Sequence, residues 1–482
     1  MRLTHILQAI AVRVLPNRGE PVKMSPRATM LLVSFLVAAS GGAALAQGPG
    51  HYCVFDAAGV CVGGDPGVPG CPGYVFPYEF PYRAIWNVPA GGAIVFGPGS
   101  FTLANEYGNN PPMWTEAGEI RGAGRGVTRL HAPANSAQYI RQAGAPRNRV
   151  IRALTLDGAY VAFTWQTGGA RVTLQDVEIM NALYGVYTQA NSSVLINNCN
   201  IHDINFSGVA AGMGGYGQGD LTVQNSTISG TGRQYNLPDC AGIVLRNSDV
   251  TVIDSDIDDN IRFGIAAQGA SSITVLGGSV SRNLGALGGA GAINVFDGEP
   301  VNVTLDGVTI ASNGVAADRH GVSHRGFCAG GSVRVTDCVI TGNGGRGLIT
   351  FNGGRTEIVN NTVVNNGAGD IHSRPYGNLC GGGPPTNHIA NNIADNILLD
   401  YGAATNAANL TAAQAAPLDA SYVPQAGSAA LDTGVSALSD GTPVAGLVGE
   451  TDHGGDPRFF CAGIDIGAQE SQVDKTLLEP SL

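Results

Sequence analysis

The chain has 482 residues, 44 % of them hydrophobic, which is enough apolar surface for a large core and excludes wholesale disorder. Its net charge of −11 argues against a basic nucleic-acid-binding face, so we expect no nucleic-acid partner. Only two of the 26 basic residues are lysines, Lys23 and Lys475, so cationic chemistry has to rest on Arg and His.

The first segment, residues 1–46, has the pattern of a leader that ends in a secretory signal peptide. Arg27 precedes an apolar run at residues 30–39, and Ala44-Leu45-Ala46 supplies a small-x-small cleavage site. The apolar run is too short to span a bilayer comfortably. We therefore expect a secreted or periplasmic protein, with no membrane span after signal removal.

The nine cysteines all follow this leader, and none of them forms a Cys-x-x-Cys pair of the kind that binds zinc. Export to an oxidising compartment favours disulfides, although the odd number leaves at least one thiol unpaired or intermolecular. The sequence does not determine the pairing of Cys53, Cys61, Cys71, Cys199, Cys240, Cys328, Cys338, Cys380 and Cys461.

An internal repeat organises the middle of the chain, in which glycine is abundant (71 residues in all). Its frame is apolar-x-apolar-x-(Asp/Asn/Gly)-x-x-(Ile/Val), as in Val250, Val252, Asp254 and Ile257, and one copy has Thr356 in the first apolar slot. The frame occurs eight times at intervals of 22–30 residues, and its last positions are Ile179, Ile201, Ile228, Ile257, Val280, Ile310, Ile340 and Val363.

Each part of the frame predicts a structural feature. Apolar residues at period two indicate short strands with one face inward, and the Asp/Asn/Gly position marks a turn that needs left-handed backbone angles. A Gly-apolar pair such as Gly321-Val322 marks a further strand in each coil. An amide column three residues after the frame predicts a hydrogen-bonded ladder made of Asn260, Asn283, Asn313, Asn343 and Asn366.

These features predict an all-β fold, a single-stranded right-handed parallel β-helix solenoid. About three short strands and no helix fit each interval, and successive coils should rise by about 4.8 Å. A leucine-rich repeat is the competing solenoid, but the Gly- and Asn-rich turns do not fit it. If the prediction is correct, Val252 lies directly over Val275.

Two further stretches resemble a known group. Residues 89–103 (PAGGAIVFGPGSFTL) and 120–130 (IRGAGRGVTRL) resemble the opening coils of the right-handed parallel β-helix, or pectate-lyase-like, superfamily of secreted bacterial proteins. Residues 427–434 (GSAALDTG) and 452–470 resemble the closing pattern of secreted β-helix proteins that include the choice-of-anchor type, with Gln469 in place of the usual Tyr. The superfamily contains lyases, hydrolases, epimerases and adhesins, so the resemblance implies the fold more than the activity.

The repeat also predicts the domain organisation. Residues 47–83 are rich in Cys, Gly and Pro and are predicted to form an N-terminal cap or linker. The parallel β-helix is predicted over residues 84–370, followed by C-terminal coils and a closing cap over residues 371–482.

A cationic cluster provides the first candidate site. Arg319 and His320 precede the strand at Gly321-Val322, and His324 and Arg325 follow it. Alignment on the glycines places Arg346 beside His320 one coil later. Arg262 falls in the column of Arg319 two coils earlier, and Phe351 falls one coil after Arg325.

These residue types fit an anionic sugar. Arg can bind a uronate carboxylate with two hydrogen bonds and ease removal of the neighbouring proton, and His can act as a base at neutral pH. The predicted catalytic residues are His320, Arg319, Arg346 and His324, and the predicted substrate-binding residues are Arg262, Arg325, Phe263 and Phe351. The alternative interpretation is a solvated face on which Asp318 pairs with Arg319.

Closely spaced carboxylates provide a second candidate. Asp256, Asp258 and Asp259 are the members of this cluster that the repeat does not require, and they suggest a Ca²⁺ site.

Two functions follow from these observations. The first is a polysaccharide-directed protein with lyase-like activity on an acidic polymer. The alternative is a non-catalytic surface, matrix or adhesin-like protein that binds a cell-surface glycan. Lyases with a Lys base, and the galacturonase-like pattern with its Arg-x-Lys motif, do not fit, because the repeats contain no lysine.

Overall fold

The structure is a computed structural model, and its described residues belong to one compact unit, residues 48–482. It describes residues 52–64, 81–103, 113–132, 139–142, 148–163, 171–188, 192–213, 219–233, 240–285, 290–296, 300–314, 316–317, 319–325, 331–351, 354–374, 387–400, 404–425, 428–431, 433–437, 443–444, 451–454 and 465–469. The predicted leader and signal peptide, residues 1–46, lie outside these ranges.

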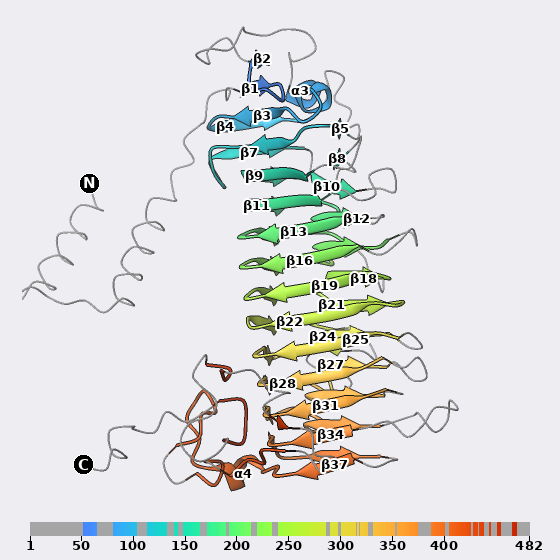
Figure 1. The fold of residues 1–482 in the computed structure, drawn as a ribbon, viewed down its shortest axis with the longest axis vertical. Coiled ribbons are helices and arrows are strands. Elements are labelled where there is room, and N and C mark those ends of the chain that lie inside the picture. Colours follow the sequence, from blue (N-terminus) through green and yellow to red (C-terminus); the bar gives the residue numbers. More distant parts are fainter. Residues whose placement is uncertain are drawn as a thin grey trace, which may run out of the picture. The chain divides into compact units, whose positions relative to one another are not determined.

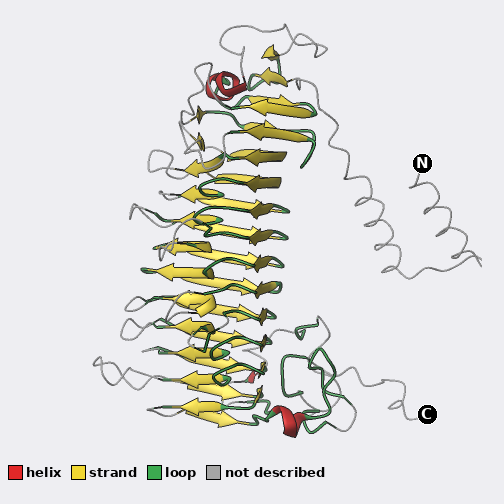
Figure 2. Cartoon of the chain, turned by 180° about the vertical axis from the view of Figure 1, so that it is seen from behind, coloured by secondary structure: helices red, strands yellow, loops and turns green. Residues whose placement is uncertain are grey.

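Two parallel sheets run along the stack of coils (Figures 1 and 2). Sheet A comprises 25 of the described strands: β1 (Tyr52–Phe55), β2 (Cys61–Gly64), β3 (Ala93–Phe96), β4 (Gly99–Thr102), β6 (Glu119–Arg121), β7 (Thr128–His131), β9 (Asn148–Asp157), β11 (Arg171–Met180), β13 (Ser193–Asn197), β14 (Asn200–His202), β16 (Asp220–Gln224), β17 (Thr227–Ser229), β19 (Asp249–Ile253), β20 (Asp256–Asp258), β22 (Ser272–Leu276), β23 (Ser279–Ser281), β25 (Asn302–Asp306), β26 (Thr309–Ala311), β28 (Val333–Thr336), β29 (Val339–Thr341), β31 (Thr356–Val359), β32 (Thr362–Val364), β34 (Asn387–Ala390), β35 (Ile393–Ala394) and β37 (Ala404–Ala407). Sheet B comprises 12: β5 (Met113–Thr115), β8 (Tyr139–Gln142), β10 (Tyr160–Phe163), β12 (Val186–Thr188), β15 (Val209–Ala211), β18 (Ala241–Arg246), β21 (Phe263–Gln268), β24 (Ala290–Val295), β27 (His320–His324), β30 (Leu348–Thr350), β33 (Ile371–Ser373) and β36 (Ile397–Leu399).

A typical coil contributes two strands to sheet A and one to sheet B, as the repeat predicts. Each strand pairs in parallel with its counterpart in the next coil, and Val252 of β19 pairs directly with Val275 of β22. The inward-facing positions of both sheets form one continuous hydrophobic core, in which Val252, Val275 and Ile257 are fully buried. The all-β parallel solenoid is therefore confirmed.

The bend between the two strands of sheet A requires left-handed backbone angles. All eight residues predicted at this bend have positive φ, between 45° and 66°, and they are Asp176, Asn198, Asn225, Asp254, Gly277, Gly307, Asp337 and Asn360. Asp, Asn and Gly tolerate this region at the lowest cost, which explains the restriction of the repeat to these types.

The predicted amide ladder closes one interior corner of the solenoid. Asn283 Nδ2 donates to Asn313 Oδ1 over 3.0 Å, and Asn313 Nδ2 donates to Asn343 Oδ1 over 3.0 Å. Each Oδ1 also accepts the backbone N–H of the preceding ladder residue, as Asn313 does from Asn283 over 3.0 Å. A second ladder, which the repeat did not predict, links Asn361, Asn392 and Asn409.

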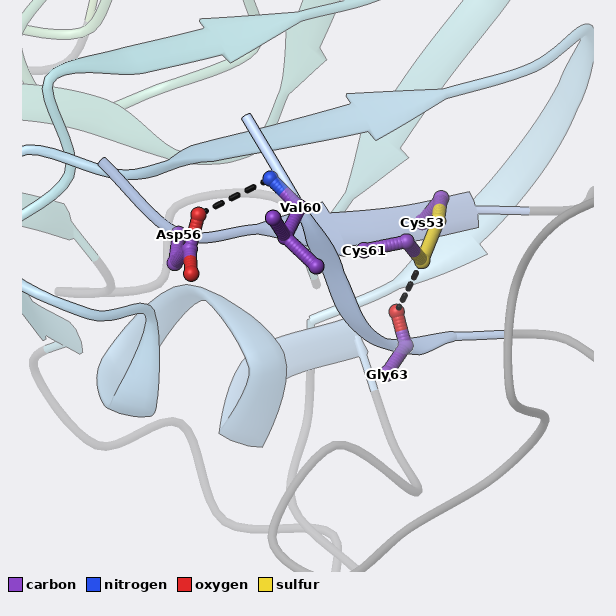
Figure 3. Close-up of a disulfide and its surroundings, with 5 residues drawn as sticks. All are labelled: Cys53, Asp56, Val60, Cys61 and Gly63. Atoms are coloured by element: carbon purple, nitrogen blue, oxygen red, sulfur yellow. Dashed lines mark hydrogen bonds between the residues drawn. A yellow bond between two sulfur atoms is a disulfide. The ribbon is translucent and has the colours of Figure 1, made fainter. Parts of the chain in front are cut away.

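The N-terminal edge of the stack is covered by a hairpin. Strand β1 pairs antiparallel with β2 and with β3, which leads into the parallel stack. Figure 3 shows the Cys53–Cys61 disulfide that joins the two arms, and the Val60 N–H that donates to Asp56 Oδ1 over 2.8 Å in the turn. The short helix α3 (Pro81–Asn87) follows.

The expected use of disulfides is confirmed by this one pair. Cys199, Cys240 and Cys338 are buried, and burial raises the pKa of the Cys199 thiol to about 11. Cys71, Cys328, Cys380 and Cys461 lie outside the described residues.

The C-terminal segment packs against the last coils. Helix α4 (Ala412–Ala415) begins after Thr411, which caps it. Farther along, the Ala468 N–H donates to Thr362 Oγ1 over 3.1 Å and the Gly467 N–H donates to the Asn391 carbonyl over 2.9 Å. Within the described part of the chain, no helix is long and apolar enough to cross a membrane.

A charged network lies on the outer face of sheet A. His202 contacts Glu178 on the preceding coil, with Nε2 3.3 Å from Oε1, and its Nδ1 lies 2.8 Å from Asp203 Oδ2. These carboxylates raise the pKa of His202, and the hydrogen bond from His202 lowers the pKa of Glu178. The side chains of this network are partly exposed, so its contribution to stability is modest.

The Asn ladder should be a main source of stability. We expect Asn313→Ala to lower the free energy of unfolding by about 2 kcal/mol or more, because it leaves buried donors on Asn283 without acceptors. Chemical denaturation measures the effect. Asn200→Ala on the outer face is the control and should change stability by less than about 0.5 kcal/mol; equal losses in the two variants would contradict the ladder's role.

The His202 network should stabilise the protein in a defined pH window. The raised pKa of His202 gives stability that is fully present below its unfolded value, about 6.5, and is lost as pH rises through the folded value. The lowered pKa of Glu178 gives stability above its unfolded value, about 4.3, that is lost as pH falls. Denaturation of His202→Gln should therefore show a loss of up to about 1 kcal/mol near pH 5.5 and a smaller one near pH 9. A larger loss at pH 9 would contradict this assignment.

Candidate active site

The candidate site is the outer face of sheet B over its last coils. Inward positions of these strands, such as Val322 and Leu348, belong to the core, so the alternate side chains face outward. Because the strands are paired in register, outward side chains of successive coils form columns along the stack.

His324 lies inside the solenoid, which corrects its predicted catalytic placement. It pairs in register with the core residue Val295 of β24 and with Thr350 of β30. Its side chain is fully buried, and its Nε2 lies 2.8 Å from the Val301 carbonyl oxygen, to which the neutral ring donates. Burial lowers the pKa of His324 to about 4, so the ring is neutral and cannot contact a polymer.

The next residue in the chain, Arg325, lies in a basic and aromatic column. Phe351 follows one coil later, because its N–H donates to the His324 carbonyl, and Arg374 and Asp400 follow on the next two coils. The guanidinium carbons of Arg325 and Arg374 lie 5.9 Å and 5.5 Å from the centre of the Phe351 ring. Both are cation–π distances.

His372 stands beside this column and pairs with Asp400. Its Nε2 lies 2.9 Å from Asp400 Oδ2, and Arg374 Nε lies 2.8 Å from the same oxygen. Desolvation lowers the pKa of His372, and Arg346 and Arg374 add to the effect while Asp400 opposes it. The hydrogen bond from His372 lowers the pKa of Asp400, so a neutral imidazole faces an ionised carboxylate.

We call Arg325, Arg346, Phe351, His372, Arg374 and Asp400 the basic–aromatic face. His320 lies next to it, because the Arg346 N–H donates to His320 Nδ1 over 3.0 Å. The proton of the neutral His320 ring is therefore on Nε2. The alignment on glycine thus placed Arg346 correctly beside His320.

Arg319 and Arg262 lie at the corner that leads into sheet B. The Gly285 N–H donates to the Arg262 carbonyl, and Arg319 Nη1 donates to the Leu284 carbonyl over 2.9 Å. The two arginines therefore share one corner two coils apart, with residues 284–285 between them. The guanidinium of Arg319 bonds to the backbone of this corner.

Phe263 is buried, so it cannot offer a face to a sugar. It is 3 % exposed and packs edge-on against Phe296, with ring centres 5.8 Å apart. Phe263 also contacts an apolar layer on the outside of sheet B that includes Val244 and Ala266. Of the two predicted stacking residues, Phe351 is the partly exposed one.

The predicted calcium ligands are engaged by other side chains. Ser279 donates to Asp256, and Arg282 pairs with both Asp258 and Asp259. A cavity of about 430 Å³ between the turn column and residues 451–454 is also acidic, with Asp254, Asp306, Asp337 and Asp452 in its lining. No group of three or more His, Cys, Asp or Glu residues among those described is arranged to hold a metal ion.

Sequence reasoning missed His372, Arg374 and Asp400. The eight-residue frame ends at Val363, so the segment after residue 366 carried no repeat signal. The alternation in Ile371-His372-Ser373-Arg374 is the one local sign of a further strand with outward polar residues.

A comparison with known protein families agrees with this fold. Residues 161–324 match a family model described as right handed beta helix region. No match to a curated protein was found. Among solved structures, the pectate lyase Pel9A is similar with a TM-score of 0.42 and 17 % identity, over 70 % of this chain and 89 % of that one.

Two epimerases are also similar in structure. The A-module of the Azotobacter vinelandii mannuronan C-5 epimerase AlgE4 has a TM-score of 0.36 and 15 % identity, over 66 % of this chain and 88 % of that one. The periplasmic alginate epimerase AlgG has a TM-score of 0.28 and 10 % identity, over 82 % of this chain and all of that one. The strand pairing and the family match together show that the chain contains a right-handed parallel β-helix.

Proposed function

We propose that this protein binds an acidic polysaccharide along the outer face of sheet B. The observation that supports the proposal is the placement of Arg325 and Arg374 on either side of Phe351 in one column of the stack. A chain with a net charge of −11 thus concentrates cationic side chains around a partly exposed aromatic ring.

The chemistry of this face suits a polymer of uronic acids. Guanidinium groups form paired hydrogen bonds to carboxylates, and the Phe351 ring offers an apolar surface to the C–H face of a sugar. The column runs along the stack axis, so a polymer lying in that direction would meet Arg325, Phe351 and Arg374 in turn. Asp400 ends the column and would repel a carboxylate there, which sets a limit to the site.

Lyase-like β-elimination is the finer part of the proposal. In this reaction an Arg neutralises the sugar carboxylate, which eases removal of the proton on the adjacent carbon by a base. Arg346 is a candidate for the first role because it lies beside His320, to which its backbone N–H donates. His320 can donate a hydrogen bond from Nε2 to a sugar oxygen, because its Nδ1 accepts from the backbone.

Binding without turnover is the second candidate. The surroundings of His320 and His324, the two histidines predicted to be catalytic, favour this candidate. His320 uses its Nδ1 lone pair on the Arg346 N–H, and His324 is inside the core. Neither histidine presents a basic nitrogen to a ligand. This arrangement is what a non-catalytic surface or matrix protein that binds a glycan would have.

Binding to polyuronates tests the proposal. We expect the protein to be retained on immobilised polygalacturonate or alginate and not on an uncharged glucan, and to be released by salt as charges are screened. The double substitution Arg325→Gln and Arg374→Gln should weaken binding about tenfold or more, because each lost exposed pair contributes up to about 1 kcal/mol.

Arg282→Gln is the matched control, since Arg282 pairs with Asp258 and Asp259 on sheet A. It should leave polyuronate affinity unchanged. Equal retention on charged and uncharged polymers, or an equal loss in the control and the double variant, would contradict the proposed site.

A further inference from the structure

Four Asn-Gly pairs occur in the chain, and three of them are rungs of the Asn ladder. These three are Asn313-Gly314, Asn343-Gly344 and Asn366-Gly367, and the fourth, Asn352-Gly353, lies outside the described residues. An asparagine that precedes glycine is prone to deamidation, because no side chain shields the glycine nitrogen and its backbone turns freely toward the amide carbon. The last three rungs of the ladder are therefore of a chemically labile type.

Close packing of the coils explains why glycine follows these rungs. A Cβ atom on Gly344 would lie 2.5 Å from the Gly314 carbonyl oxygen, and one on Gly367 would overlap the Gly344 carbonyl oxygen. The first two rungs are followed instead by Ile261 and Leu284, whose residues are 40 % and 44 % exposed. The labile pairs are thus the consequence of a tight corner beside the last three rungs.

Folding immobilises both reacting groups of each pair. Asn343 Oδ1 accepts from the Asn313 N–H and from Asn313 Nδ2, each over 3.0 Å, so the amide carbon cannot turn toward the glycine nitrogen. The attacking nitrogen is also engaged, because the Gly344 N–H donates to the Asn313 carbonyl over 3.0 Å. The N–H groups of the other two glycines donate in the same way to the carbonyl of the preceding rung.

The product of deamidation does not fit the ladder. Asn343 is 1 % exposed, and its Nδ2 donates to the Ile310 carbonyl over 3.2 Å and to Asn366 Oδ1 over 2.9 Å. An aspartate in its place would offer no donor to these two acceptors and would bring a charge into a buried corner. A chain that is modified while unfolded therefore cannot rebuild the native ladder.

We propose that Asn313, Asn343 and Asn366 are sites of spontaneous deamidation, which the folded ladder suppresses and which makes prolonged unfolding irreversible. In the unfolded chain the glycine nitrogen loses its proton and attacks Cγ of the preceding asparagine. The new N–Cγ bond closes a succinimide ring, the Cγ–Nδ2 bond breaks, and Nδ2 takes up a proton and leaves as ammonia. Water then opens the ring to aspartate or isoaspartate.

Peptide mass spectrometry of the full chain tests the sites. In alkaline denaturant the three rungs before glycine should deamidate, whereas Asn260 and Asn283, which precede Ile261 and Leu284, should remain amides over the same period. In the folded protein at the same pH, the three rungs should react at least about a hundredfold more slowly, because only an opened corner can react. Equal rates in the folded and unfolded protein, or at all five rungs of the unfolded chain, would overturn the proposal.

Refolding tests the claim of irreversibility. After partial modification in denaturant, the molecules that refold should be depleted in deamidated rungs, and the molecules that fail to refold should be enriched in them. The same degree of modification in the two fractions would contradict this part of the proposal.

A substitution that reproduces the product needs no chemical treatment. Asn343→Asp should lower the denaturation midpoint and the refolding yield. Asn302→Asp is the matched control, because the exposed Asn302 Oδ1 accepts from the Ser332 N–H over 3.0 Å and from its hydroxyl over 2.8 Å, and a carboxylate keeps both bonds. The control should unfold and refold as the wild type does, and the same behaviour in Asn343→Asp would overturn the proposal.

Discussion

In-register stacking of the coils is the constraint on which the rest of the structure depends. Each coil must place the same kind of residue over its counterpart, because inward columns share one core and turn columns share one left-handed bend. The Asn ladder enforces this register, since each Oδ1 accepts from both the side chain and the backbone of the preceding rung. A shift by one residue would break the ladder and turn the core outward.

The same constraint decides which residues reach a ligand. His324 and Arg325 are neighbours in the chain, yet strand alternation sends the first into the core and the second to the surface. Register then aligns Arg325, Phe351, Arg374 and Asp400, although successive members are 23–26 residues apart in sequence. In-register strands, and not loops, therefore bring residues that are distant in sequence onto one surface of the solenoid.

Much of the fold could be predicted from the sequence, and the site only in part. The eight bends, the Asn column and the position of Arg346 beside His320 follow from the spacing alone. The side-chain pairings between coils do not, so Asp258 and Asp259 suggested a cation site although Arg282 neutralises them. His372 was missed because the repeat frame ends before its coil, while the strand pairing continues.

The most direct test is a crystal structure of the protein with a bound uronate oligosaccharide. The account predicts a sugar ring against Phe351, flanked by Arg325 and Arg374. An oligosaccharide bound on sheet A or in the acidic cavity near Asp452, with the outer face of sheet B empty, would contradict it.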